Sequence, residues 1–193
     1  MGALEKRAGR RLTRALAVQA MLVAVPLLTV PTWAGGEPAL EYEIKATFLY
    51  KFGPFVNWPQ GDLSASDSPF RLCIVGDDEV ASLSSEATQN QQVLGHPVKI
   101  VHLDAVTHDS GCDELYTAGS PAQTIADGLA AVKGTPTLTV TDSEHEPDAH
   151  GIIQFVIDRE RVRFDVDTAA AAANGISISS KLLQLAHNVS PRP

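Results

Sequence analysis

Six short runs with the composition of β-strands, and the helical segments between them, most constrain the fold that this chain can adopt. The runs are largely apolar or β-branched, as expected of buried strands. They cover residues 70–75, 98–103, 114–117, 138–141, 152–157 and 161–166. Only three residues separate the last two runs, which predicts an antiparallel hairpin. Strands that alternate with helices and end in a hairpin predict an α/β fold: a mixed β-sheet of about six strands, flanked by helices on both faces, in a single domain.

Helix signals lie between these runs. Apolar residues recur at steps of three and four from residue 37 to about residue 52, where Gly53-Pro54 ends the pattern. Asp77, Asp78 and Glu79 follow the first strand and predict the capped start of a second helix. The predicted helices cover residues 37–52, 80–88, 120–132 with Ser120-Pro121 at its start, 168–173 capped by Asp167 or Thr168, and 179–187.

The first 34 residues have the pattern of a signal peptide. Five Lys or Arg residues lie between positions 6 and 14, and residues 15–30 carry no charge. This apolar run of 16 residues is shorter than the roughly 20 that a membrane-spanning helix needs. The small residues Thr32 and Ala34 flank Trp33, which predicts cleavage after Ala34 and an exported domain of residues 35–193. The alternative is an uncleaved membrane anchor.

Removing this segment uncovers a strongly acidic domain. Residues 35–193 hold 10 Lys and Arg against 22 Asp and Glu, a formal net charge of −12, whereas the whole chain carries −8. Such a domain repels phosphate backbones. We therefore expect no nucleic-acid partner.

The chain has two cysteines, Cys73 and Cys112, and both lie in the exported part. In an oxidising compartment an even pair of cysteines is expected to be bonded, and one pair allows a single connectivity. We predict a Cys73–Cys112 disulfide. The alternative is a pair of buried free thiols.

No set of residues predicts an enzyme. Asp77 and Asp78 after a strand resemble the metal-binding acids of a phosphoacceptor domain, with Asp104 and Thr141 as the remaining candidates, but helix capping explains the two acids better. Residues 144–150 hold two histidines and three acids, a composition able to bind zinc or copper, although a solvated acidic turn is the favoured interpretation. We predict no catalytic residues, no metal and no cofactor.

Aromatic residues gather between positions 48 and 58. An aromatic helix face is most often part of the core, but Tyr50, Phe55 and Trp58 lie off the main apolar stripe. Aromatic side chains are where binding energy concentrates in protein interfaces. These three residues are therefore candidate contacts with a partner protein.

Several motifs together resemble the YfiR family of periplasmic regulators. They are Phe-Val-Asn-Trp-Pro at 55–59, Phe-Arg-Leu-Cys-Ile-Val-Gly at 70–76, Cys-Asp-Glu-Leu-Tyr at 112–116, the runs 151–157 and 161–167, and Ile-Ser-Ser-Lys-Leu-Leu at 178–183. The resemblance covers nearly all of residues 35–193. It implies a helix-flanked mixed sheet, a tendency to form homodimers, a periplasmic location and no enzymatic activity.

The resemblance also implies a function. The best-known member of the family represses an inner-membrane diguanylate cyclase through the periplasmic portion of that enzyme. Cys73 and Cys112 match the family's strand-to-strand disulfide, whereas the second cysteine pair of that member has no counterpart in residues 143–151 here. We expect a repressor of this kind, lowering cyclic-di-GMP signalling, with Tyr50, Phe55, Trp58, Ser179, Lys181 and Leu182 as its partner contacts.

A second hypothesis is a small-molecule binding module. In this alternative, a pocket at the strand ends near Gly76 and Thr141 binds a ligand and passes the signal to a membrane sensor kinase or transporter.

Overall fold

The computed structural model describes residues 37–59, 68–142, 146 and 148–191. The predicted signal peptide lies outside these residues. In chain order the elements are α1 (Glu37–Phe52), the 3-10 helix η1 (Gly53–Phe55), β1 (Val56–Asn57), β2 (Phe70–Val75), α2 (Asp78–Ala87), β3 (Gln92–Val93), β4 (His96–Leu103), the 3-10 helix η2 (His108–Ser110), β5 (Glu114–Thr117), α3 (Ile125–Ala131), β6 (Leu138–Asp142), β7 (Ile153–Asp158), β8 (Arg161–Asp167), α4 (Thr168–Ala173), β9 (Ser177–Ile178), α5 (Ser180–Leu183) and β10 (Asn188–Ser190).

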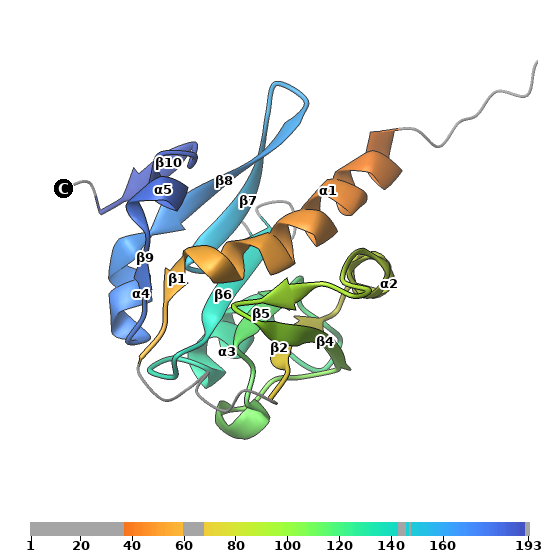
Figure 1. Ribbon diagram of the computed structural model, residues 1–193, viewed down its shortest axis with the longest axis horizontal. Coiled ribbons are helices and arrows are strands. Elements are labelled where there is room, and N and C mark those ends of the chain that lie inside the picture. Colours follow the sequence, from red (N-terminus) through yellow and green to blue (C-terminus); the bar gives the residue numbers. More distant parts are fainter. Residues whose placement is uncertain (1–36, 60–67, 143–145, 147, 192–193) are drawn as a thin grey trace, which may run out of the picture. The chain divides into compact units, whose positions relative to one another are not determined.

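One eight-stranded mixed sheet organises the domain, in the order β10-β8-β7-β6-β5-β2-β4-β3 (Figure 1). Five adjacent strands of this sheet, β4, β2, β5, β6 and β7, run parallel to one another. At the two ends of this group, β8 is antiparallel to β7 and β3 is antiparallel to β4. A second sheet pairs β1 with β9. The predicted mixed α/β fold is confirmed, and the predicted strands are joined by four short ones, β1, β3, β9 and β10.

The two faces of β2 pack against different layers. Phe70, Leu72 and Ile74 belong to the large core beneath α1 and α2, whereas Cys73 and Val75 pack on the opposite face with a smaller apolar cluster at the end of α3. This is the alternation of side chains that a strand buried on both faces requires. The helices therefore cover both faces of the sheet.

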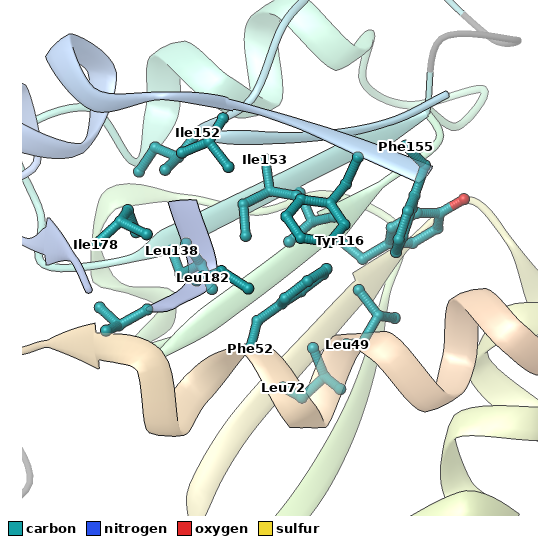
Figure 2. Packing of buried hydrophobic residues seen from close by; sticks show 14 of the residues in the cluster. Leu49, Phe52, Leu72, Tyr116, Leu138, Ile152, Ile153, Phe155, Ile178 and Leu182 are labelled. Atoms are coloured by element: carbon teal, nitrogen blue, oxygen red, sulfur yellow. The ribbon is translucent and has the colours of Figure 1, made fainter. Parts of the chain in front are cut away.

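Aromatic side chains fix α1 on the sheet. Phe52 stacks on Phe48 with ring centroids 5.8 Å apart, and its edge meets Phe164 of β8 at 5.2 Å. Leu49 and Phe52 are almost fully buried, and Figure 2 shows them facing Leu72 and Phe155 of the sheet. The apolar pattern of residues 37–52 thus predicted both the helix and its buried face. Among the described residues, no helix is both long and apolar enough to cross a membrane.

The predicted Cys73–Cys112 disulfide is confirmed. It links β2 to the segment just before β5, with the two Cα atoms 5.8 Å apart. Hydrogen bonds join the same two segments, since the Arg71 amide donates to Asp113 at 2.7 Å and the Arg71 guanidinium donates to the Gly111 carbonyl at 2.7 Å. The crosslink therefore lies at a place where the fold already brings the two segments together.

The predicted start of the third helix is wrong. α3 begins at Ile125 with Thr124 as its N-cap, whereas Ser120 and Gln123 form an isolated bridge. The Ser120 hydroxyl donates to the Asp104 carbonyl and accepts from the Gln123 amide at 3.1 Å, so it organises a turn instead of a helix. Ser-Pro is a turn signal as well as a helix-start signal, and the contact with residue 104 decides between the two.

The last predicted helix is shorter than expected. α5 ends at Leu183, not near His187, because the chain turns away to form β10. The His187 amide donates to the Phe164 carbonyl at 2.8 Å, and β10 then pairs in parallel with β8. Pairing with the edge of the sheet therefore competes with continuation of the helix.

Candidate functional site

The small sheet brings together the two chain segments predicted to contact a partner. Val56 of β1 pairs with Ile178 of β9, and the Ser179 amide donates to the Phe55 carbonyl at 2.8 Å. Figure 1 shows the two strands side by side, although about 120 residues separate them in the chain. We call residues 54–59 and 177–181 the β1–β9 patch.

The predicted aromatic contacts lie at different depths around this patch. Phe55 and Trp58 are half-buried within it, and the Trp58 ring meets Phe70 edge-to-face with the centroids 6.0 Å apart. The Trp58 indole nitrogen is buried and has no hydrogen-bond partner among the described residues. Tyr50 is half-buried on α1, with the Lys51 ammonium 5.8 Å from its ring centroid. Each of the three therefore offers part of its ring to solvent and packs the rest on the core.

The second segment divides into outward-facing and inward-facing residues. Ser179 caps α5 by accepting from the Leu182 amide at 3.4 Å, and Lys181 is exposed. Leu182, by contrast, is only 3% exposed and packs in the core near Ile178 (Figure 2). The expectation that Leu182 contacts a partner therefore needs correction, because its side chain is used inside its own domain.

The β1–β9 patch differs in charge from the rest of the domain. Lys181 is its one charged residue, although residues 35–193 carry a formal charge of −12. Asn57 and Ser177 are exposed on the two strands, and the Asn57 amide donates to the Ser177 hydroxyl at 3.2 Å. Interface cores are depleted in charge and enriched in aromatic side chains. The patch, aromatic and with a single charge, therefore has the composition of an interface core.

Among the described residues, backbone contacts fill the space at the carboxyl ends of the parallel strands near Gly76 and Thr141, where the alternative hypothesis expects a pocket. Gly76 has a φ of 82°, and a Cβ atom at this position would lie 1.5 Å from the Gly119 carbonyl oxygen. Only glycine permits this approach, and the backbone of the loop that follows β5 fills the space above the carboxyl end of β2. Thr141 is fully buried and accepts from the Gly151 amide at 3.0 Å.

The acids after β2 act in helix capping, as predicted. Asp77 accepts from the Val80 amide at 2.9 Å, and the Asp78 side chain is 95% exposed and lies 3.3 Å from His102. The Asp77 carboxylate is thus occupied by the helix start. This arrangement gives no support to the phosphoacceptor interpretation.

A buried ion pair joins α1 to the end of β6. Lys45 contacts both Asp142 and Glu41, and the side chains of Lys45 and Asp142 are each about 1% exposed. Burial by itself lowers the pKa of the Lys45 ammonium, but hydrogen bonds to Asp142 and Glu41 outweigh it and raise the pKa. The Lys45 ammonium therefore stays charged, and its contacts link α1 to the end of β6.

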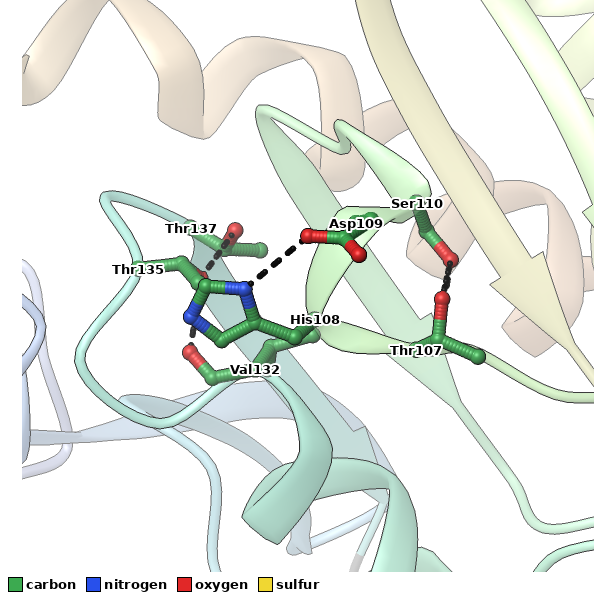
Figure 3. Close-up of polar contacts among 7 residues, drawn as sticks. All are labelled: Thr107, His108, Asp109, Ser110, Val132, Thr135 and Thr137. Carbon is green, nitrogen blue, oxygen red and sulfur yellow. Dashed lines mark hydrogen bonds and ion pairs between the residues drawn. The ribbon is translucent and has the colours of Figure 1, made fainter.

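A cavity of about 390 Å³ opens at the amino ends of β2, β5 and β6 and reaches Cys112. Its polar groups are paired with one another, as Figure 3 shows. The Thr107 and Ser110 hydroxyls are 3.2 Å apart, His108 and Asp109 are 3.3 Å apart, and Thr135 donates to the Val132 carbonyl at 2.6 Å. Because these groups already have partners, the cavity presents no specific demand for a ligand.

The loop considered for metal binding, residues 144–150, lies partly outside the described residues. Within the described part, Glu146 accepts from the Ile125 amide at 3.1 Å. Glu146 thus contributes to the start of α3. Among the described residues, no three His, Cys, Asp or Glu side chains come together in a way that could hold a metal ion.

Sequence reasoning did not identify Asn57 and Ser177 as parts of the same surface. Strands of two residues are too short to show a periodic pattern, and their pairing depends on contacts between distant parts of the chain.

Comparison with known proteins places these features in a family. The sequence model of the YfiR/HmsC-like family matches residues 42–187, about three quarters of the chain. No curated protein matches. A solved structure described as a conserved domain protein from Vibrio cholerae O1 biovar El Tor strain N16961 aligns with a TM-score of 0.53 at 13% identity. The alignment covers 77% of this chain and 60% of that protein, so the chain spans about three fifths of its length. At this identity the similarity concerns the fold alone.

Proposed function

The chain belongs to the YfiR/HmsC-like family of periplasmic regulators, and from this membership we propose that it binds and represses the periplasmic portion of an inner-membrane diguanylate cyclase. In this proposal residues 1–34 are a signal peptide and residues 35–193 are a non-enzymatic periplasmic domain that acts as a homodimer. The basic and apolar pattern of the first residues and the Cys73–Cys112 disulfide support export to an oxidising compartment.

Repression follows from differential affinity. A protein that binds the inactive state of its partner more tightly than the active state shifts the partner toward inactivity. Moving the partner from 99% active to 99% inactive requires a difference of about 5.5 kcal/mol in binding free energy. An interface with a few well-buried aromatic anchors can supply a difference of this size.

The β1–β9 patch is the surface that we assign to this contact. Its half-buried Phe55 and Trp58 provide aromatic anchors, Ser179 contacts Phe55 through its backbone, and the exposed Lys181 follows two residues later. Because Lys181 is the one charged residue of the patch, the matching surface of the partner is expected to be apolar with an acidic group at its edge. Tyr50 lies farther along α1 and extends the proposed surface.

Genetic complementation tests the proposal. Deleting the gene should raise cellular cyclic-di-GMP, and the wild-type gene should restore the original level. The double variant Asn57→Asp/Lys181→Glu changes two exposed side chains and makes the patch acidic, so it should fail to complement while reaching normal protein levels. Lys99→Glu, the same substitution at an exposed site on β4, is the matched control and should complement fully.

Two results would count against the proposal in different ways. An unchanged cyclic-di-GMP level in the deletion strain would refute repression of a cyclase. Full complementation by the double variant would instead leave repression standing and refute the assignment to the β1–β9 patch. Light scattering on the exported protein tests the homodimer, which predicts twice the mass of one domain.

A further inference from the structure

A second cavity lies on the sheet face opposite α1, over β7, β8 and β10. It has a volume of about 290 Å³, and its polar lining includes His150, Gln154, Asp165, Asp167, Asn188 and Ser190. Strand register explains why these residues meet. Gln154, Asp165 and Asn188 are lateral neighbours across the three strands. Two residues farther along β8 and β10, Asp167 pairs with Ser190. Lateral neighbours on one sheet face are close enough for their side chains to act together.

Gln154 gives this cavity an unsatisfied donor. The side chain is only 6% exposed, and its amide nitrogen has no hydrogen-bond partner among the described residues. The amide oxygen is already engaged, because it contacts the Nδ1 atom of His150. A buried donor without a partner is unfavourable, so an acceptor that enters the cavity is stabilised by pairing with it.

Two carboxylates give the cavity a negative charge. Asp165 accepts from His187 through Oδ1 at 3.0 Å, and Asp167 accepts from the Ala169 and Ala170 amides through Oδ1 at 2.8 and 2.9 Å. In each case Oδ1 is occupied, whereas Oδ2 has no hydrogen-bond partner among the described residues and remains for a ligand. None of the described residues that line the cavity is a Lys or an Arg that could balance these charges.

We propose that this cavity binds a small hydroxylated organic cation of about the size of an amino sugar. The ammonium group is held by Asp165 and Asp167, and a hydroxyl oxygen accepts from the Gln154 amide nitrogen. Asn188 and Ser190 supply further polar contacts at the rim. Anions are disfavoured by the two carboxylates, and purely apolar ligands leave Gln154 unpaired.

Glucosamine and glucose form a matched pair of probes, since they differ only in an ammonium group that replaces a hydroxyl. Calorimetric titration of the protein purified after export should show glucosamine binding with a dissociation constant of about 1 mM or tighter. Glucose should bind about 10–100-fold more weakly, because it lacks the charge-assisted hydrogen bonds.

Variants locate the site. Asp165→Asn should weaken glucosamine binding about 10–100-fold, and Asn188→Ala, a change at an exposed residue, should weaken it by a smaller factor. Gln154→Met should weaken glucosamine binding, since it removes the unpaired amide donor that the ligand hydroxyl would accept from. Asp109→Asn, an exposed acid outside the cavity, is the control and should change nothing.

The proposal is overturned if glucosamine shows no saturable binding up to about 10 mM. It is equally overturned if glucose binds as tightly as glucosamine, or if Asp165→Asn and Asn188→Ala both keep wild-type affinity. These measurements need no membrane partner, so their failure is distinguishable from failure of the repressor function.

Discussion

Reduction of the Cys73–Cys112 disulfide should lower the free energy of unfolding by about 4 kcal/mol. The two cysteines are 39 residues apart, and the entropy of closing such a loop in the unfolded chain gives this value. The folded state should change little, because the hydrogen bonds from Arg71 to Asp113 and Gly111 hold the same two segments together. Cys73 is fully buried and Cys112 is 7% exposed, so the thiols remain packed after reduction.

Urea unfolding with and without a phosphine reductant measures this difference directly. Reduction should also increase the dependence of the unfolding free energy on urea, since the uncrosslinked unfolded chain exposes more surface. For a domain of this size the loss corresponds to a fall in melting temperature of about 8–16 °C. The double variant Cys73→Ala/Cys112→Ala has no disulfide, so its free energy of unfolding should not depend on the reductant. It therefore controls for effects of the reagent.

A loss of less than about 1 kcal/mol would refute this reasoning, because the loop-closure contribution could then not dominate. Loss of the native circular dichroism spectrum on reduction would refute the expectation that the folded state changes little. That result would mean that the folded domain depends on the crosslink and is not held by the surrounding contacts.

Two further predictions concern buried charges. Asp142→Ala should lower the free energy of unfolding by about 3–5 kcal/mol, because it leaves Lys45 buried without its main partner. Glu41→Ala, at a partly exposed site, should lower it by about 1 kcal/mol or less. Urea unfolding of both variants measures the two losses. Burial raises the pKa of Glu114 well above its ordinary value, so the stability of the wild-type protein should fall as the pH rises from about 4.3 through the folded-state pKa. Glu114→Gln should remove this fall. Unfolding midpoints measured between pH 4.5 and 8 test the prediction, and equal pH dependence of the two proteins would contradict it.

Much of the fold could be predicted because its central elements carry strong local signals. Residues 37–52 show a helical apolar period ended by Gly53-Pro54, and α1 ends at Phe52. The apolar run 70–75 coincides with β2, and residues 114–117 coincide with β5. In these elements the local preference and the buried environment favour the same structure.

The remaining elements depend on contacts between distant residues. β1, β9 and β10 are two or three residues long, and each exists through its pairing with another strand. The start of α3 was misjudged because the Ser120 hydroxyl bonds to Asp104, a residue from a different loop. No local pattern contains that information.

The candidate sites follow the same division. Phe55 and Ser179 could each be proposed from composition and resemblance, but only the β1–β9 pairing shows that they share a surface. Leu182 was assigned to the wrong side, because the segment is too short for periodicity to separate its faces. The cavity near Gln154 and Asp165 was missed, since it requires the register of β7 against β8.

The cavity and the β1–β9 patch are connected by a short stretch of chain. Asp167 lines the cavity and caps α4, and β9 begins at Ser177, ten residues later. A cation that draws the Asp167 carboxylate away from the α4 amides weakens that cap, whereas one that fixes the carboxylate in place strengthens it. The chain between the two sites consists of α4 and the turn at Gly175, which has a left-handed φ of 72°. Because coupling between two binding sites is reciprocal, a ligand that alters partner affinity through this path must have its own affinity altered by the partner by the same factor.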